Sequence, residues 1–206
     1  MVRCATRLFG LALAVTYLSG CISPLLGKEA EIHYEAAQRF EHAGDYVSAR
    51  NQYAQALMRA RSAGVDRATL SMLTYNYARN SGYACHLDDA EKYLLEALEL
   101  EKGVTGPESG ISSMRMFELA RLYFDQGNYA NSAEYYSLGV PIVERLGAQN
   151  SDPLAYSDAL DEYAVALNRI GKTSEGSKIA AKASATRDQH ADSTRQFVPI
   201  RYKCAK

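Results

Sequence analysis

The chain has 206 residues, with 23 lysines and arginines against 24 aspartates and glutamates and a formal net charge of −1 at pH 7. This near balance excludes the broad basic surface that nucleic-acid-binding proteins need, and also a polybasic arm for anionic lipid. The length suffices for one domain with its own core or for a short repeat array.

The first 20 residues have the features of an export signal. Arg3 and Arg7 give a positive start, and the apolar run 8–18 is shorter than the ~20 residues that span a bilayer. The run ends in the letters LSGC, the last of which is Cys21. This motif resembles the bacterial lipoprotein signal, which implies removal of residues 1–20 and acylation of Cys21. An ordinary signal peptide that happens to end before a cysteine is the alternative.

Lipidation of Cys21 would anchor the chain to a membrane. A single acyl chain binds only marginally, whereas the diacyl or triacyl cysteine implied by the resemblance supplies two anchoring signals. Ile22 stands where enterobacterial lipoproteins retained at the inner membrane carry aspartate, which favours the outer membrane and its periplasmic side. We assign 21–28 to the lipidated cysteine and a tether, of which 22–27 reaches ~20 Å at ~3.5 Å per residue.

Beyond the tether the chain repeats itself. Four similar turns are centred on Gly44, Cys85, Gly127 and Gly171, which lie 41, 42 and 44 residues apart. Seven residues before each turn stands an alanine, and five residues after it a small residue; the pairs are Ala37 with Ala49, Ala78 with Ala90, Ala120 with Ser132, and Ala164 with Gly176. This register predicts two antiparallel helices per repeat, crossing closely at the small residues.

The pattern resembles the tetratricopeptide repeat (TPR), whose Gly-Asp-Tyr-x-x-Ala turn is literal at residues 44–49. The spacing exceeds the usual ~34 residues. The resemblance implies an all-α, right-handed α-solenoid of about four antiparallel helix pairs over residues 29–190, followed by a tail, 191–206. We expect larger side chains to fill the wider gaps between helices: Phe40, Tyr123, Leu167, Tyr53, Leu94 and Tyr136.

The apolar periodicity gives the expected helices in chain order. Pro107 and the pair Asp152-Pro153 mark helix starts. Pro141 should kink or shorten the sixth helix, and the thin apolar face around Gly176 suggests a frayed or capping last helix. The predicted ranges are 29–43, 46–62, 67–82, 87–102, 109–126, 130–146, 153–170 and 173–188.

With Cys21 acylated, the remaining cysteines are Cys85 and Cys204, in a compartment that permits disulfides. In one interpretation Cys85 and Cys204 form a disulfide bond. In the other, Cys85 is a small buried thiol and Cys204 a free tail thiol.

The sequence contains no recognisable catalytic or metal-binding set. The four histidines are scattered, HExxH and CxxC are missing, and Gly103–Gly106 runs into Pro107 as a plain linker. We therefore expect no enzyme activity, no cofactor and no metal; a cluster of Cys85, His86 and an acid would revive the enzyme hypothesis.

If the protein binds peptides, the resemblance places the site on the inner surface formed by the first helix of each pair. An arginine beside an aromatic residue in two successive repeats suits a peptide with acidic groups, because arginine forks onto carboxylates. In the alternative interpretation these arginines pair with Glu118 or neighbouring acids. The groove positions are Tyr34, Gln38, Tyr75, Arg79, Tyr83, Phe117, Arg121, Phe124 and Asn168, with Asp161 and Val165 beside the last.

The tail has an apolar centre, Phe197–Ile200, between polar residues. We expect it to cover the last repeat, and the alternative is a segment that docks in the groove or on a partner. The function we expect is a protein-interaction scaffold or assembly adaptor, lipid-anchored in the bacterial cell envelope, with protein or peptide partners. A binder of a small ligand or cell-wall glycan in the tyrosine-rich groove is the alternative.

Overall fold

The computed structural model describes residues 24–195 and 199–204, and within them the chain is entirely helices and connections. None of these helices is both long and apolar enough to cross a membrane. In chain order the helices are α1 (Pro24–His42), α2 (Tyr46–Ala63), α3 (Arg67–Tyr83), α4 (Leu87–Thr105), α5 (Gly110–Asp125), α6 (Tyr129–Arg145), α7 (Ala148–Ser151), α8 (Pro153–Arg169) and α9 (Thr173–Gln189).

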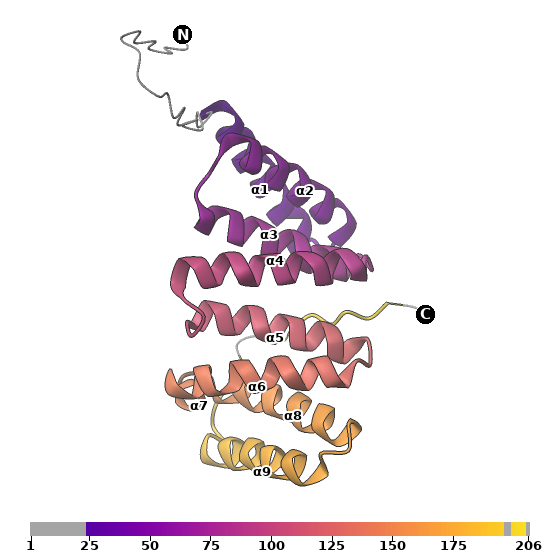
Figure 1. Cartoon of the computed structure of the whole chain (residues 1–206), viewed down its shortest axis with the longest axis vertical. Coiled ribbons are helices and arrows are strands. Elements are labelled where there is room, and N and C mark those ends of the chain that lie inside the picture. Colours follow the sequence, from indigo (N-terminus) through magenta and orange to yellow (C-terminus); the bar gives the residue numbers. More distant parts are fainter. Residues whose placement is uncertain (1–23, 196–198, 205–206) are drawn as a thin grey trace, which may run out of the picture.

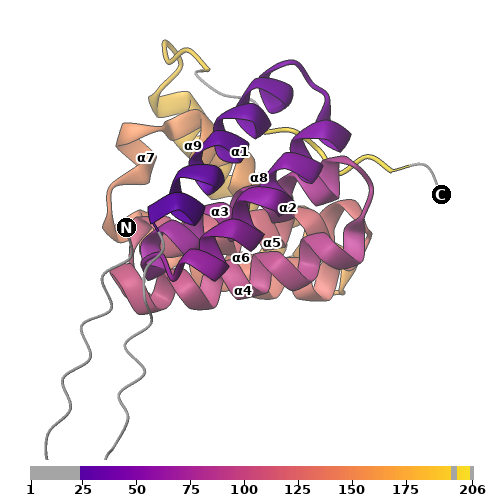
Figure 2. The same cartoon turned by 90° about the horizontal axis from the view of Figure 1, so that it is seen from above.

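The helices form four antiparallel pairs stacked in one row: α1 with α2, α3 with α4, α5 with α6, and α8 with α9 (Figure 1). The view along the row shows the first pair crossing the later ones at an angle, so the stack twists (Figure 2). The expected α-solenoid of four helix pairs is confirmed.

Small residues let the two helices of a pair approach closely. The four alanines on the first helices are buried, and so are the four small residues that face them on the second helices. Five of the six larger residues expected in the gaps are also buried, but Phe40 is 38% exposed, so its assignment was wrong. Phe40 precedes the turn at Gly44, and within the described residues no helix pair comes before α1 for Phe40 to pack against.

The turns between paired helices share one backbone geometry. At Gly44, Cys85, Gly127 and Gly171 the backbone is left-handed, with φ between 64° and 83°. In each turn two backbone N–H groups return to carbonyls of the helix that is ending, as in Gly44 to Glu41 and Asp45 to Phe40. Glycine adopts this conformation without strain, which explains three of the four residues.

Helix α1 begins earlier than predicted. It starts at Pro24, not residue 29, because proline has the φ of a first helical residue and lacks the N–H that would remain unpaired there. Cys21 and the rest of residues 1–23 lie outside the described residues. The tether expected to run to residue 28 is therefore helical from Pro24 onward.

Two further helices can be compared with their predictions: α6 is not shortened at Pro141, and of the two alternatives for α9 the structure agrees with a capping helix. Helix α6 continues past Pro141 to Arg145. Because proline has no N–H, the Ser137 carbonyl loses its hydrogen bond within the helix, but both residues are exposed to solvent. Helix α9 is continuous over Thr173–Gln189 and not frayed. Gly176 lies so close to α8 that a Cβ there would come within 2.9 Å of the Ala164 carbonyl, which explains the glycine and closes the stack.

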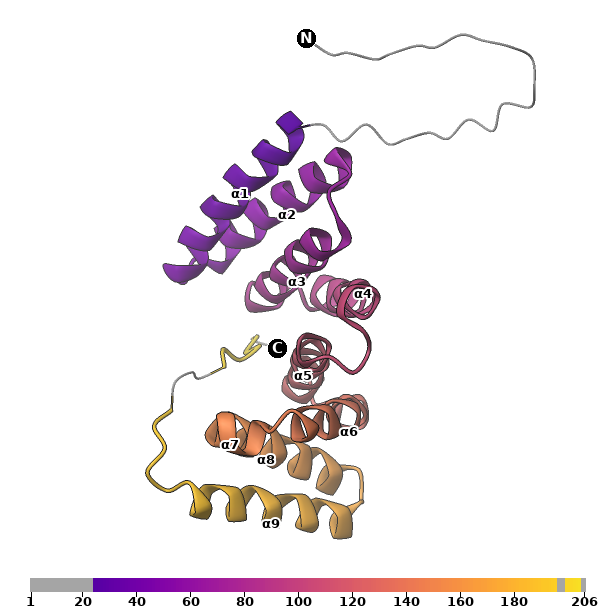
Figure 3. The same ribbon diagram turned by 90° about the vertical axis from the view of Figure 1, so that its left-hand side faces the viewer.

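The first helices of the pairs, α1, α3, α5 and α8, line one side of the stack (Figure 3). After α9 the chain turns back along this side and ends beside α3 and α5. The described end of the tail, residues 199–204, lies in the inner surface, which agrees with the alternative of docking in the groove. Phe197 and Val198, from the apolar centre of the tail, lie outside the described residues.

Candidate binding cleft

The second repeat departs from the others at two positions, and both touch the tail. The turn residue is Cys85 where the other repeats have glycine, and three residues earlier stands Gly82, where the others have Glu41, Phe124 and Asn168. A left-handed conformation costs a non-glycine residue about 1 kcal/mol or more, and glycine inside a helix costs about 1 kcal/mol relative to alanine. Two unfavourable residues so close together indicate that a contact outside the repeat pattern selects them.

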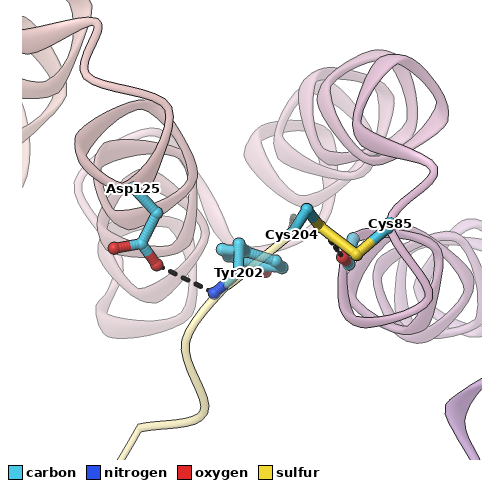
Figure 4. Close-up of a disulfide and its surroundings, with 5 residues drawn as sticks. Cys85, Asp125, Tyr202 and Cys204 are labelled. Carbon is cyan, nitrogen blue, oxygen red and sulfur yellow. Dashed lines mark hydrogen bonds between the residues drawn. A yellow bond between two sulfur atoms is a disulfide. The ribbon is translucent and has the colours of Figure 1, made fainter. Parts of the chain in front are cut away.

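For Cys85 this contact is a disulfide bond to Cys204 (Figure 4). The two Cα atoms are 5.5 Å apart, within the usual range for a disulfide. Cys85 is exposed and Cys204 partly exposed. The bond joins the second turn to a residue 119 positions further along the chain.

Tyr202 fills the space that Gly82 leaves. Its side chain is 3% exposed, and a Cβ on Gly82 would collide with its ring. The ring stacks on Tyr83 with centroids 5.0 Å apart and planes 22° from parallel. The Tyr202 N–H donates to Asp125 at 2.8 Å (Figure 4). The Tyr202 hydroxyl donates to Glu118.

Arg201 lies next to a second group of acids. Its guanidinium donates to Asp125, with Nε 3.0 Å from Oδ1, and to Glu162 on α8, and it lies over the ring of Phe124. Burial lowers the pKa of Arg201, but the hydrogen bonds and charges of Asp125 and Glu162 outweigh it and raise that pKa. The arginine therefore stays charged, and three helices hold one dipeptide.

We call this surface the tail cleft: Gly82, Tyr83 and Cys85 from the second repeat, Glu118, Phe124 and Asp125 from α5, and Glu162 from α8. At its centre Glu118 accepts from Tyr202, from Tyr75 at 3.3 Å and from Arg121 at 3.2 Å. Burial, and then the Glu118 charge, raise the pKa of Tyr202 well above its ordinary value. The same two effects raise the pKa of Tyr83 to about 12, against the opposing charge of Arg79.

Four of the predicted groove residues converge around Glu118. Arg79 lies over the rings of Tyr75 and Tyr83, and Arg121 pairs with Glu118 on its own helix. Arg79 also pairs with Glu41 of α1 at 3.6 Å. The side chains of Arg79 and Arg121 are only 18% and 15% exposed, so both arginines already have acidic partners and little free surface.

The remaining predicted residues lie around or outside this group. In the first repeat, Tyr34 accepts a hydrogen bond from Gln38 and packs on Tyr53 of the same helix pair. Phe124 contacts Arg201. Phe117 packs against Gly139 and Tyr136 of α6, so it belongs to the core between α5 and α6. In the fourth repeat Asn168 lies against Gly176 of α9, Asp161 pairs with Arg187, and Val165 is exposed.

Three residues of the cleft were missed by the sequence analysis: Gly82, Asp125 and Glu162. Gly82 has a sequence signal, because it is the glycine in a position that is large in the other repeats. Asp125 and Glu162 have none, since their partner Arg201 is 76 and 39 positions away.

The described residues offer little support for a metal site or for a cysteine nucleophile. Among them no group of three or more histidines, cysteines, aspartates or glutamates is placed to hold a metal ion. The Cys85 sulfur, which a cluster with His86 would have needed as a nucleophile, is bonded to Cys204.

No protein-family model and no curated protein matches the sequence. Solved structures do resemble the fold. The crystal structure of BtubC (BKLC) from P. vanneervenii superposes with a TM-score of 0.73 at 18% identity, covering 86% of this chain and 68% of that one. A kinesin light chain-like protein of Podosopora anserina, with nearly identical TPR-like repeats, gives a TM-score of 0.66 at 17% identity, covering 81% and 77%. The fold is therefore a TPR-like solenoid.

Proposed function

We propose that this protein is a non-catalytic protein-interaction scaffold, held at a bacterial membrane by a lipid on Cys21. The observation that carries the proposal is the distribution of apolar side chains on the inner surface of the TPR-like stack. Met72 and Met114 occupy the same position, 13 residues before the turn, on α3 and α5, and are 37% and 56% exposed. Exposed methionines adapt to varied partner surfaces.

The part of the inner surface that the tail leaves free lies towards the starts of α1, α3 and α5. Met72, Tyr75 and Arg79 share one face of α3, since they are three and four residues apart. Between α1 and α3 lies a hollow of ≈ 180 Å³ whose lining includes Ala30, Tyr34 and Met72. We infer that a protein partner contacts this region, which we call the methionine surface: Tyr34, Met72 and Met114.

The membrane attachment rests on the LSGC motif and on the start of α1 at Pro24. With Cys21 lipidated, only Ile22 and Ser23 separate the lipid from the first helix, which would hold the solenoid against the membrane. The outer membrane, on its periplasmic side, is the location that Ile22 favours.

The glycan or small-ligand alternative would need a pocket closed by the tail. Tyr202 itself fills the space between Gly82 and Glu118. We therefore favour the scaffold.

Photo-crosslinking in intact cells tests the proposed interface. A photoreactive residue replaces Met72 or Met114, and the matched control replaces Gln55, which is exposed on α2. We expect the same protein adduct from Met72 and Met114 and none from Gln55. Adducts of equal yield from all three positions, or from Gln55 alone, would refute the interface.

Cell fractionation tests the anchor. Placed behind an ordinary cleavable signal peptide, so that the apolar run 8–18 is absent, the Cys21→Ser chain should move from the membrane pellet to the supernatant, because the lipid is lost while the fold is unchanged. Wild type that is found in the supernatant, or a Cys21→Ser variant that stays in the membrane pellet, would contradict lipid anchoring.

A further inference from the structure

The tail cleft has features of a recognition site. It combines three acidic side chains with two aromatic rings and a slot made by Gly82, and the tail segment that occupies it has no regular secondary structure. Its contacts with Arg201 and Tyr202 use all of these groups. These groups favour a peptide with a cationic side chain followed by an aromatic one. The acids bind the cation, the slot at Gly82 accepts the ring, and the acids would repel an acidic peptide.

The covalent link at the cleft is accessible. Cys85 is exposed and Cys204 partly exposed, so a thiol can reach the sulfur atoms. Exposed disulfides are the class in which labile and regulatory bonds are found. The peptide contacts are separate from this bond, so reduction leaves the tail held by noncovalent contacts alone.

We propose that the tail cleft is a receptor site for a partner segment carrying an arginine followed by an aromatic residue, and that the chain's own tail is its resident occupant, which the partner segment can displace once Cys85–Cys204 is reduced. This deepens the proposed scaffold function and rests on it. The reductant is a dithiol of the thiol–disulfide oxidoreductase class. Its two thiols give two electrons and two protons to the Cys85–Cys204 bond, which becomes two thiols while the oxidoreductase becomes a disulfide.

Disulfide capture of a peptide tests the specificity of the cleft. The receptor is the full chain with Cys4→Ser, Cys21→Ser and Cys204→Ser, which leaves Cys85 as its thiol, and with Arg201→Glu and Tyr202→Ala to weaken the resident tail. The probe is the peptide Pro-Ile-Arg-Tyr-Lys-Cys as its symmetric disulfide. The Cys85 thiolate attacks one peptide sulfur and gives a mixed disulfide and a free peptide thiol. Probes with glutamate for arginine, or alanine for tyrosine, are the matched controls.

We expect the native probe to be captured about tenfold more than either control at exchange equilibrium. Equal capture of all three probes would overturn the proposal, because Cys85 would then be merely reactive. So would a failure of the native probe in a receptor whose Cys85 alkylates readily and whose circular dichroism is helical.

A second measurement uses the wild-type chain, so it does not depend on the folding of the receptor variant. In reductant, the alkylation rate of Cys204 is followed with and without the probe in which serine replaces cysteine. Displacement of the tail should raise the rate severalfold, and the probe with glutamate for arginine should not. An unchanged rate with the native probe at saturating concentration would overturn the proposal. If the photo-crosslinking experiment still gave adducts at Met72 and Met114, only the tail-cleft proposal would fail and the scaffold function would remain supported.

Discussion

At the scale of single residues, the inner surface is organised by side chains that break the repeat. Gly82 is the smallest residue at a position that elsewhere holds glutamate, phenylalanine or asparagine, and the space is filled by Tyr202. The buried carboxylate of Glu118 is tolerated because Arg121, Tyr75 and Tyr202 all donate to it. The tail is thus a packed part of the molecule.

The slot at Gly82 makes a prediction about stability. Gly82→Ala should lower the free energy of unfolding by about 1–3 kcal/mol, because the new methyl group collides with the Tyr202 ring. The control is Gly27→Ala in α1, where a Cβ would meet nothing within 4 Å, and which should stabilise by about 0.5–1 kcal/mol. Chemical denaturation measures both.

A double mutant separates the collision from other effects. In a Tyr202→Ala background, Gly82→Ala should lose most of its penalty, since the ring is gone and the Ala90 Cβ, 3.2 Å from the new methyl group, is the remaining close contact. The same penalty in both backgrounds would mean that Tyr202 does not occupy the slot.

The tyrosines of the cleft make stability depend on pH. The pKa of Tyr83 is raised from its ordinary value of 10 to about 12, chiefly by burial and then by Glu118. A group whose pKa is raised in the folded state contributes stability that is complete below its unfolded pKa and is lost as pH rises to the folded value. Stability should therefore fall from pH 10 towards about 12.

Denaturation midpoints across this range check the prediction. Tyr83→Phe removes the ionising group, so its stability should fall less steeply than that of wild type above pH 10. Parallel pH curves for the two proteins would contradict the assignment.

At the scale of elements, much of the fold could be predicted from the sequence. The small residues around each turn predict the helix pairs, because only close-packed helices need them in that register. The start of α1 at Pro24 was missed because residues 24–27 resemble a tether. Phe40 was misassigned because no described helix pair precedes the first repeat. The one-turn helix α7 carries no periodic apolar face and so leaves no signal.

From the backbone geometry at Cys85 we predict that Cys85→Gly raises stability in reductant and lowers it under oxidising conditions. In reductant, Cys85→Gly should stabilise the protein by about 1 kcal/mol, because glycine relieves the left-handed backbone. Under oxidising conditions the same variant should be less stable than wild type, since it loses a cross-link over 119 residues, for which the chain-entropy model gives ~5 kcal/mol.

Thermal melts with and without reductant measure this reversal of sign. A Cys85→Ser variant is the control, as it removes the cross-link without relieving the backbone. If Cys85→Gly and Cys85→Ser have the same stability in reductant, the turn residue carries no strain.

At the scale of the whole molecule, the tail divides the inner surface into two regions. The tail cleft is occupied by residues of the same chain, whereas the methionine surface is exposed. Of the groove residues expected from the repeat resemblance, Tyr75, Arg79, Tyr83 and Arg121 come together, and the two arginines pair with acids of the protein. Repeat register identifies which helix face is inward, and it cannot reveal a distant segment that folds back on it.

The central claim is that Cys204 is bonded to Cys85 and holds the tail in the cleft. The most direct measurement is mass spectrometry of the non-reduced protein after trypsin digestion with free thiols blocked. Cleavage at Arg79, Lys92 and Lys203 separates a peptide of residues 80–92 from one of residues 204–206. We expect these two peptides to be joined, and to separate on reduction. Blocked, unlinked Cys85 and Cys204 in protein purified without reductant, or Cys204 joined to another cysteine, would contradict the account.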